Sequence, residues 1–390
     1  MSLILVLIAC SAQDTSQDTI QEKTTQPSID MEQQSVILLS DITKGDLVIS
    51  EIMHDPIEIP DWRGEWIEIY NAHTKSINLN GLSVESGGSS EIGFTINSEL
   101  IIEPDGYVVL ANTENSVING GNTEVDFQYK YTSFKLLGAA SILLSYNGTV
   151  LDTVSYDKSF PLIAGRSLMN RSLNATNNDS VDDWCYSFSI YGTNNAGTPG
   201  AKNDRCLGGD ALSTGDLVIT EIMSDPNAVA DWRGEWFEIQ NSSNAMINLK
   251  NLTIIGGPPS SLGRVTINEN YFIEPNAYFV FGTKSAENGG YTPDYLYPYN
   301  DMKLIKEGSI SLSSNGTEID TVQWDSSWTM SVGASFNLSS SFADSTLNDD
   351  VKHWCNSTKS YGDGDLGSPG AMNVDCGGTA NNDGTLPSDH

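Results

Sequence analysis

The sequence predicts an all-β protein made of two tandem β-sandwich domains, and two observations lead to this prediction. Residues 45–71 recur at 215–241, with 19 of 27 positions identical and a fixed offset of 170 residues. Both copies consist of short apolar runs separated by Gly, Asn, Pro and Asp, a pattern typical of many short strands. A repeat of this length is a whole domain, because solenoid units span only roughly 20–50 residues.

Two local patterns support the strands. The run 46–53 has apolar residues on both faces of an extended chain, as expected of a strand that is buried on both sides. These residues are Leu47, Ile49 and Met53 on one face and Val48 and Ile52 on the other. Asn-Gly pairs at 147–148 and 315–316 each separate two apolar runs, and this dipeptide predicts a two-residue hairpin turn.

The first ten residues, MSLILVLIAC, predict export. The apolar run Leu3–Ala9 is too short to span a bilayer and has the length of the apolar part of a signal peptide. Leu7-Ile8-Ala9-Cys10 resembles the lipobox of bacterial lipoproteins, in which cleavage before the cysteine is coupled to its acylation. We therefore expect a signal peptide over residues 1–9 and a lipid on Cys10. The alternative is an ordinary secretory signal.

Composition divides the rest of the chain. Residues 11–44 are rich in Gln, Ser, Thr and Asp and predict a disordered tether, which would reach roughly 30–35 Å from an anchor. The two domains are expected over residues 45–206 and 215–376, joined by a linker at 207–214. The polar, Gly-rich residues 377–390 predict a disordered tail.

The charge of the chain limits its partners. Acidic residues outnumber basic ones by 51 to 19, so the net charge is −32. A surface of this sign repels phosphate backbones, and nucleic-acid binding is therefore not expected. Such a surface suits bound divalent cations, or it is simply solvated.

Four of the five cysteines occupy equivalent positions in the two copies. Cys185 and Cys206 lie 21 residues apart, as do Cys355 and Cys376, and this spacing predicts one disulfide within each copy. A zinc site is disfavoured, because two cysteines per copy without a repeated histidine leave a tetrahedral site unfilled. Disulfides indicate an oxidising compartment, and Cys10 is then left free to carry a lipid.

Several segments together resemble the lamin tail domain in its bacterial form. In the first copy these are 48–53 (VISEIM), 64–71 (GEWIEIYN), 77–82 (INLNGL) and 197–203 (GTPGAKN), and the second copy repeats the pattern. The resemblance covers nearly all of both repeats and implies an immunoglobulin-like β-sandwich. In nuclear lamins this domain binds proteins and DNA, and no catalytic residues of its own are established. The resemblance therefore implies a binding module and leaves its ligand open.

The repeated acidic residues around 55–65 predict a calcium site, because Ca²⁺ prefers several oxygen ligands converging from a flexible loop. The expected ligands are Asp55, Asp61 and Glu65 in the first copy and Asp225, Asp231 and Glu235 in the second. The expected supporting carboxylates are Glu51 and Glu68, with Glu221 and Glu238. The alternative is a purely architectural loop, in which Arg63 pairs with an acid while Trp62 and Trp66 pack.

The remaining motifs do not favour catalysis. None of the four histidines recurs in the other copy, and the common hydrolase and nucleotide-binding motifs are absent from the sequence. A paired-carboxylate hydrolase is the one enzymatic alternative. The repeated tryptophans are expected in the cores. The second copy has additional aromatic residues that could form a platform for a sugar or a peptide: Tyr291, Tyr295, Tyr297, Tyr299, Trp324 and Trp328.

Together these features predict an exported, lipid-anchored bacterial envelope protein at the outer membrane or cell surface, or alternatively a secreted one. Its two domains are expected to bind an envelope protein or another surface ligand. The alternatives are a calcium-stabilised adhesion module and a hydrolase or carbohydrate-active accessory protein.

Overall fold

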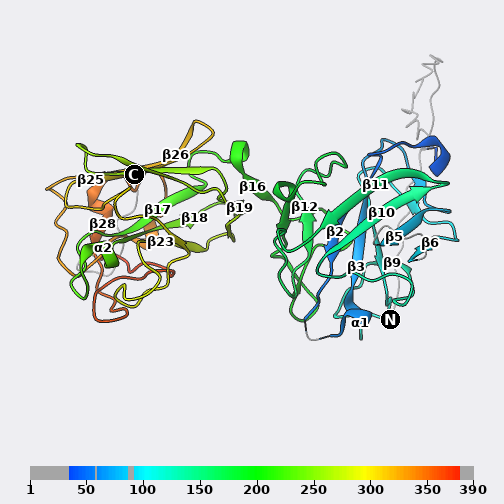
Figure 1. Ribbon diagram of the computed structural model, residues 1–390, viewed down its shortest axis with the longest axis horizontal. Coiled ribbons are helices and arrows are strands. Elements are labelled where there is room, and N and C mark those ends of the chain that lie inside the picture. Colours follow the sequence, from blue (N-terminus) through cyan, green and yellow to red (C-terminus); the bar gives the residue numbers. More distant parts are fainter. Residues whose placement is uncertain (1–34, 58, 87–91, 378–390) are drawn as a thin grey trace, which may run out of the picture. The chain divides into compact units, whose positions relative to one another are not determined.

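The computed structural model describes residues 35–57, 59–86 and 92–377, and nearly all of their regular structure is β (Figure 1). The predicted signal peptide, Cys10, most of the predicted tether and the tail from residue 378 lie outside these ranges. In the described part of the chain, no helix has the length and apolar character needed to cross a membrane.

The first domain contains a six-stranded and a four-stranded sheet. The larger sheet has the order β13-β12-β2-β3-β8-β9, with strands Trp184–Tyr186 (β13), Leu168–Asn170 (β12), Leu47–Met53 (β2), Trp66–Asn71 (β3), Tyr107–Ala111 (β8) and Val125–Gln128 (β9). The smaller sheet has the order β11-β10-β5-β6, with strands Thr149–Tyr156 (β11), Ala140–Tyr146 (β10), Ser83–Ser86 (β5) and Gly93–Thr95 (β6). The short elements are Ile37–Leu38 (β1), Ile77–Asn78 (β4), Ile101–Ile102 (β7), Ile190–Tyr191 (β14), Asn195–Ala196 (β15), the helix Asp61–Gly64 (α1) and the 3-10 turns Leu39–Asp41 and Val181–Asp183.

The second domain repeats this plan. Its larger sheet has the order β24-β23-β18-β17-β27-β28, with strands Tyr295–Leu296 (β24), Tyr278–Gly282 (β23), Trp236–Asn241 (β18), Leu217–Met223 (β17), Phe336–Leu338 (β27) and Trp354–Asn356 (β28). Its smaller sheet has the order β21-β20-β25-β26, with strands Gly263–Thr266 (β21), Leu252–Gly257 (β20), Gly308–Ser314 (β25) and Thr317–Trp324 (β26). The short elements are Cys206–Gly208 (β16), Met246–Asn248 (β19), Phe272–Ile273 (β22), the helix Asp231–Gly234 (α2) and the 3-10 turns Gly209–Ala211, Ser340–Phe342 and Val351–His353.

The six-stranded and four-stranded sheets of each domain enclose one apolar core, and short strands form the further three-stranded sheets β1-β4-β7 and β16-β19-β22. In the first domain, Ile49, Ile67 and Leu110 of the larger sheet belong to the same buried cluster as Ile142 and Val154 of the smaller sheet. Strand β25 shows the alternation that such a sandwich requires, because every second residue from Gly308 to Ser314 is buried. The predicted all-β sandwich fold is confirmed.

Strand β2 is buried along its whole length, as its two-sided apolar pattern predicts. A bulge shifts its register against β3 between Ile49 and Glu51, and this extra residue exchanges the two faces beyond it. Ile52 therefore joins Ile49 in the core, whereas Met53 packs with Trp66 on the outer face of the sheet. The prediction that Met53 shares a face with Ile49 was wrong, because strict alternation fails at a bulge.

The domain boundaries lie earlier than the sequence predicts. Strand β1 pairs with β4 in parallel, and Leu39 and Ile42 are buried in the first core, so the predicted tether over 11–44 is wrong in its last residues. The segment 207–214 is not a free linker either. Cys206–Gly208 form β16, which pairs in parallel with β19, and Leu212 is buried in the second core. Strand pairs of two or three residues are too short to show a sequence period.

Both predicted hairpins are confirmed. The Asn-Gly pair at 147–148 connects β10 to β11, and the pair at 315–316 connects β25 to β26. All four residues have positive φ angles, between 47° and 86°, which are those of a type I′ turn.

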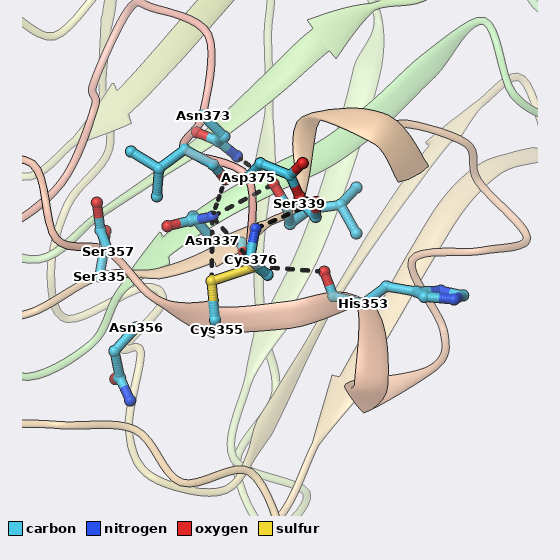
Figure 2. Close-up of a disulfide and its surroundings, with 12 residues drawn as sticks. Ser335, Asn337, Ser339, His353, Cys355, Asn356, Ser357, Asn373, Asp375 and Cys376 are labelled. Carbon is cyan, nitrogen blue, oxygen red and sulfur yellow. Dashed lines mark hydrogen bonds between the residues drawn. A yellow bond between two sulfur atoms is a disulfide. The ribbon is translucent and has the colours of Figure 1, made fainter. Parts of the chain in front are cut away.

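Both predicted disulfides are also confirmed, as Cys185–Cys206 and Cys355–Cys376. Figure 2 shows the second disulfide among side chains that hold the end of the domain against β27. Asn337 Nδ2 donates to the carbonyl of Val374 at 3.1 Å, and Ser339 Oγ donates to Asp375 Oδ1 at 2.5 Å. The disulfide thus closes the C-terminal segment onto the larger sheet.

Reduction of these disulfides should destabilise both domains. Each disulfide joins residues 21 apart, which is worth roughly 3 kcal/mol in the chain-entropy description. We expect a lower Tm in a reducing agent than in its absence, measured by circular dichroism. A Cys355→Ser/Cys376→Ser variant should retain only the response of the first domain. An unchanged Tm on reduction would contradict the prediction.

Candidate functional site

The repeated carboxylates Glu51 and Glu68 are cross-strand neighbours on the outer face of the larger sheet, and both are fully buried. Glu51 accepts hydrogen bonds from the Thr198 amide at 2.9 Å and the Thr198 hydroxyl at 2.8 Å. Glu68 Oε2 accepts one from the Gly200 amide at 2.8 Å. The pair therefore binds the chain's own C-terminal segment and covers the sheet with it.

The second copy builds the same arrangement. Glu221 accepts from the Ser368 amide at 3.0 Å and from the Ser368 hydroxyl, and Glu238 Oε2 accepts from the Gly370 amide at 2.7 Å. This explains the recurring Gly-Thr/Ser-Pro-Gly-Ala sequence, because it supplies two amides and a hydroxyl at a fixed spacing. We name residues 197–203 and 367–373 the C-terminal straps. The four glutamates hold these straps, which is not the metal-supporting role that the sequence predicts.

Burial dominates the acid–base behaviour of these pairs. Desolvation raises the pKa of Glu51 and of Glu221 to about 7, although the hydroxyl and amide donors oppose the shift. The pKa of Glu68 and that of Glu238 are also raised, first by burial and then by the charge of the neighbouring glutamate. Each pair therefore favours holding a proton near neutral pH.

The predicted calcium ligands do not point into one site. Asp55 and Asp61 are exposed, whereas Glu65 is buried on the core side of the sheet. In the second copy Asp231 is exposed, Asp225 is half-buried and Glu235 is buried. In the three described ranges, no group of three or more His, Cys, Asp or Glu residues is arranged to hold a metal ion. Calcium binding stays a prediction that this geometry does not support.

Glu65 and Glu235 each have one carboxyl oxygen without a partner. Oε2 of Glu65 accepts from the Leu136 amide at 3.0 Å, and Oε2 of Glu235 accepts from the Leu304 amide at 2.8 Å, while both Oε1 atoms are buried and unpaired. Burial raises the pKa of Glu65 to about 8 and that of Glu235 to about 9. A neutral carboxyl group is a poor ligand for Ca²⁺, so both residues are better explained as protonated core groups.

The helix α1 places Trp62 and Arg63 at the surface. Gly64 packs so closely on Ile59 and Pro56 that a Cβ there would lie 2.4 Å from Ile59 Cδ1, so this turn of helix tolerates no side chain on its inner side. Trp62 is 48% exposed, and the Arg63 guanidinium lies 4.3 Å from the centroid of its ring. Trp232 and Arg233 repeat this stack at 4.5 Å.

The loop 112–122 lies beside α1. Asn112 Nδ2 donates to the Asp61 carbonyl at 2.7 Å, and Gly120 contacts Ile59 where a side chain would clash. The loop exposes two aliphatic residues, Val117 at 88% and Ile118 at 37%. We name this surface of the first domain the Trp–Arg site: Ile59, Trp62, Arg63, Val117 and Ile118.

Arg63 has no ion pair among the residues that the structure describes, and its buried Nε has no hydrogen-bond partner. The equivalent arginine of the second domain is paired, because Arg233 Nη1 lies 2.8 Å from Glu287 Oε2. That Arg63 pairs with an acid stays a prediction, because Glu58 of the same loop lies outside the described residues. Trp62 and Arg63 are thus of the two residue types that are enriched among those that dominate binding at protein interfaces.

The other aromatic predictions have a mixed outcome. Trp66, Trp184, Trp236 and Trp354 are core residues, as expected, whereas Trp62 and Trp232 are exposed because they lie on a helical turn outside the sheet. The predicted aromatic platform of the second copy was wrong. Its tryptophans and two of its four tyrosines are buried: Tyr291, Tyr297, Trp324 and Trp328. Sequence reasoning missed the Trp–Arg site, and the signal was the repeated Asp-Trp-Arg-Gly turn itself.

Comparison with protein families identifies the domains. The Lamin Tail Domain family matches residues 40–158 and 211–326, which together make up more than half of the chain. The chain belongs to the lamin tail domain family. The matches end before the C-terminal straps, yet β12, β13, β27 and β28 lie in the same sheets as the matched strands. Each lamin tail domain of this chain therefore includes a C-terminal part that the family match does not reach.

A crystal structure of a DUF4876 family protein from Bacteroides thetaiotaomicron VPI-5482 also aligns with this lamin tail domain protein. The alignment covers 80% of this chain and 95% of that chain, at 11% sequence identity and a TM-score of 0.24. At this level of similarity it carries no argument about function. No curated protein matches the chain.

The stability of both lamin tail domains should fall as the pH rises. The folded pKa is about 7 for Glu51 and Glu221, about 8 for Glu65 and about 9 for Glu235, above the usual value of 4.5. At a pH between the usual value of 4.5 and the raised pKa of each group, the folded state binds more protons than the unfolded state. The free energy of unfolding therefore decreases as the pH rises. We expect a higher Tm at pH 5.5 than at pH 8.5. A Glu65→Gln/Glu235→Gln variant should show a smaller difference, and an equal difference would contradict the assignment.

Calcium binding by the acidic loop makes a separate prediction. A ligand that binds only the folded state raises the Tm by mass action, so millimolar Ca²⁺ should raise it relative to excess EDTA. The rise should be reduced in Asp61→Ala/Asp231→Ala, because these exposed carboxylates would be direct ligands. Identical melts in EDTA and Ca²⁺ would make the loop purely architectural.

Proposed function

We propose that this protein is an exported, lipid-anchored envelope protein whose lamin tail domains bind other proteins at the cell surface. The observation that carries the binding role is the Trp–Arg site, which combines an exposed tryptophan, the arginine stacked on it and exposed aliphatic residues. Tryptophan and arginine are enriched among the residues that dominate binding energies at protein interfaces. The family match supports the same role, because it identifies β-sandwich binding modules.

The proposed location rests on the sequence. The segment MSLILVLIAC supports cleavage before Cys10 and its acylation, and the polar residues that follow would hold the first domain away from the membrane. The two disulfides support an oxidising compartment. With a net charge of −32, a protein ligand is favoured over nucleic acid.

The hydrolase alternative has less support. The buried pairs Glu51–Glu68 and Glu221–Glu238 accept hydrogen bonds from the C-terminal straps, so these carboxylates face the protein's own backbone. Glu65 and Glu235 are buried on the core side of the sheet. General acid–base chemistry requires a carboxyl group within reach of a substrate, and the repeated buried glutamates do not offer one.

Photo-crosslinking in intact cells tests this proposal. A photoreactive amino acid at position 117, in the Trp–Arg site, should give protein adducts, whereas the same group at position 150, on the exposed β10–β11 hairpin, should not. The Cys10→Ser variant should lose both fatty-acid labelling and the adducts, because the protein would leave the membrane. Equal adducts from the two positions, or none from position 117, would contradict the binding role. Fatty-acid labelling that persists in Cys10→Ser would contradict the anchor.

A further inference from the structure

A cleft of about 500 Å³ lies beside the helix α2 of the second lamin tail domain. Three segments of this domain form it: α2 itself, the first residues after β23 and the turn that follows β24. All residues of these segments are described, and the volume lies in the range of roughly 300–1,000 Å³ that is typical of sites for small ligands. The residues that line the cleft are Trp232, Thr283, Lys284, Pro298, Tyr299 and Asn300.

A buried hydroxyl group without a partner lies at this cleft. Thr283 is only 7% exposed, and its Oγ1 makes no hydrogen bond to any residue that the structure describes. The hydroxyl of the neighbouring Tyr291 donates its own proton to the carbonyl of Glu235 at 3.1 Å, so it offers no proton to Thr283. Buried polar groups normally have a hydrogen-bond partner. Because Thr283 lines a cleft, its position indicates a partner that binds there.

Two aromatic side chains also line the cleft. Trp232 is 43% exposed, and Tyr299 is half-buried. Each ring has an ammonium group nearby, since Lys284 Nζ lies 5.5 Å from the centroid of Trp232 and Lys303 Nζ lies 5.0 Å from that of Tyr299. Of the aromatic platform that the sequence predicts for the second copy, Tyr299 takes part in this cleft. The lining thus combines aromatic surface with polar groups.

The charges around the cleft have both signs. Lys284 and Lys303 lie at its aromatic rings, and two exposed carboxylates, Asp231 and Asp301, directly adjoin lining residues in the sequence. The lining itself therefore carries no excess of positive charge that would select an anion. The net charge of −32 further opposes an anionic ligand. A neutral ligand with many hydrogen-bonding groups fits these surroundings best.

We propose that this cleft binds a neutral saccharide, at a site additional to the protein-binding surface proposed above. One face of a pyranose ring consists of C–H groups, which can pack on the aromatic surface of Trp232 and Tyr299. The hydroxyl groups at the edge of the ring both donate and accept hydrogen bonds, and they meet Thr283, Lys284 and Asn300. One of these sugar hydroxyls supplies Thr283 with the partner that the protein does not provide.

The first domain has different residues at the equivalent positions. Asn112 and Thr283 each directly follow the last residue of β8 or β23, two strands with the same register in their sheets. Asn112 Nδ2 donates to the Asp61 carbonyl of α1 at 2.7 Å, so the first domain uses this position for a bond of its own. The next residue is Thr113 in place of Lys284. Saccharide binding is therefore assigned to the second domain.

Affinity electrophoresis of the full chain tests the proposal. Each native gel contains one neutral polysaccharide (amylose, a β-1,3-glucan, xylan, mannan or galactan), next to gels without polysaccharide and gels with polygalacturonate. We expect retardation in at least one neutral gel, none with polygalacturonate, and loss of the retardation in Trp232→Ala. An absence of retardation in every neutral gel would overturn the proposal. Retardation by polygalacturonate alone would overturn the choice of a neutral ligand.

Tyr299→Ala and Tyr131→Ala form a matched pair of variants. In both domains the lysine four residues further along has its Nζ 5.0 Å from the tyrosine ring, so the two changes remove the same local contact. Tyr131 lies in the first domain and outside the Trp–Arg site. Tyr299→Ala should lose the retardation, whereas Tyr131→Ala should keep it. Equal loss in the two variants would contradict a site in the second domain.

Thr283→Val separates a binding role of the hydroxyl from a structural one. Valine keeps the shape of threonine, so the variant loses only the hydroxyl. The Kd for an oligosaccharide of the retarding polysaccharide, measured by isothermal titration calorimetry, should rise about tenfold, because one hydrogen bond is lost. The Tm without sugar should not fall, because this hydroxyl makes no hydrogen bond within the described part of the domain. An unchanged Kd, or a lower Tm, would reject Thr283 as the anchor of the ligand.

Discussion

The structure of each domain depends on a pair of buried glutamates at the centre of its larger sheet. Glu51 and Glu68 lie side by side where water is excluded, and the amides of Thr198 and Gly200 bind them from above. Without these acceptors, the C-terminal strap would have no polar partner on the sheet, and the outer face with Met53 and Trp66 would be open to water. Burial is tolerated because the raised pKa of both groups lets the pair hold a proton.

The C-terminal strap that these glutamates bind adds a further layer to each sandwich, on the outer face of the larger sheet. Strands β2 and β17 are buried on both faces, with the core on one side and the strap on the other. The disulfide of each domain fastens the same C-terminal segment a few residues further on. The helical turns α1 and α2 and the loops beside them lie at the surface and take no part in this framework.

The two copies share their framework and differ at this surface. Both stack an arginine on an exposed tryptophan, and among the described residues the ion pair on this arginine is that of Arg233 with Glu287 in the second domain. Tandem domains with the same fold therefore differ in the side chains that they present at equivalent surfaces.

The sequence alone determined the repeat, the all-β fold, the hairpins and the disulfides, because each depends on local pattern or on equivalent positions in the two copies. It could not show the bulge that separates Met53 from Ile49, or the two-residue and three-residue strands that begin each domain, because neither has a period to detect. The roles of the repeated acids were decided only by tertiary structure. Glu51 and Glu65 are equally acidic in the sequence, but one faces the strap and the other the core, and Asp61 faces solvent. The ion pair between Arg233 and Glu287 likewise emerged only from the fold, since a contact between distant segments leaves no mark on either segment by itself.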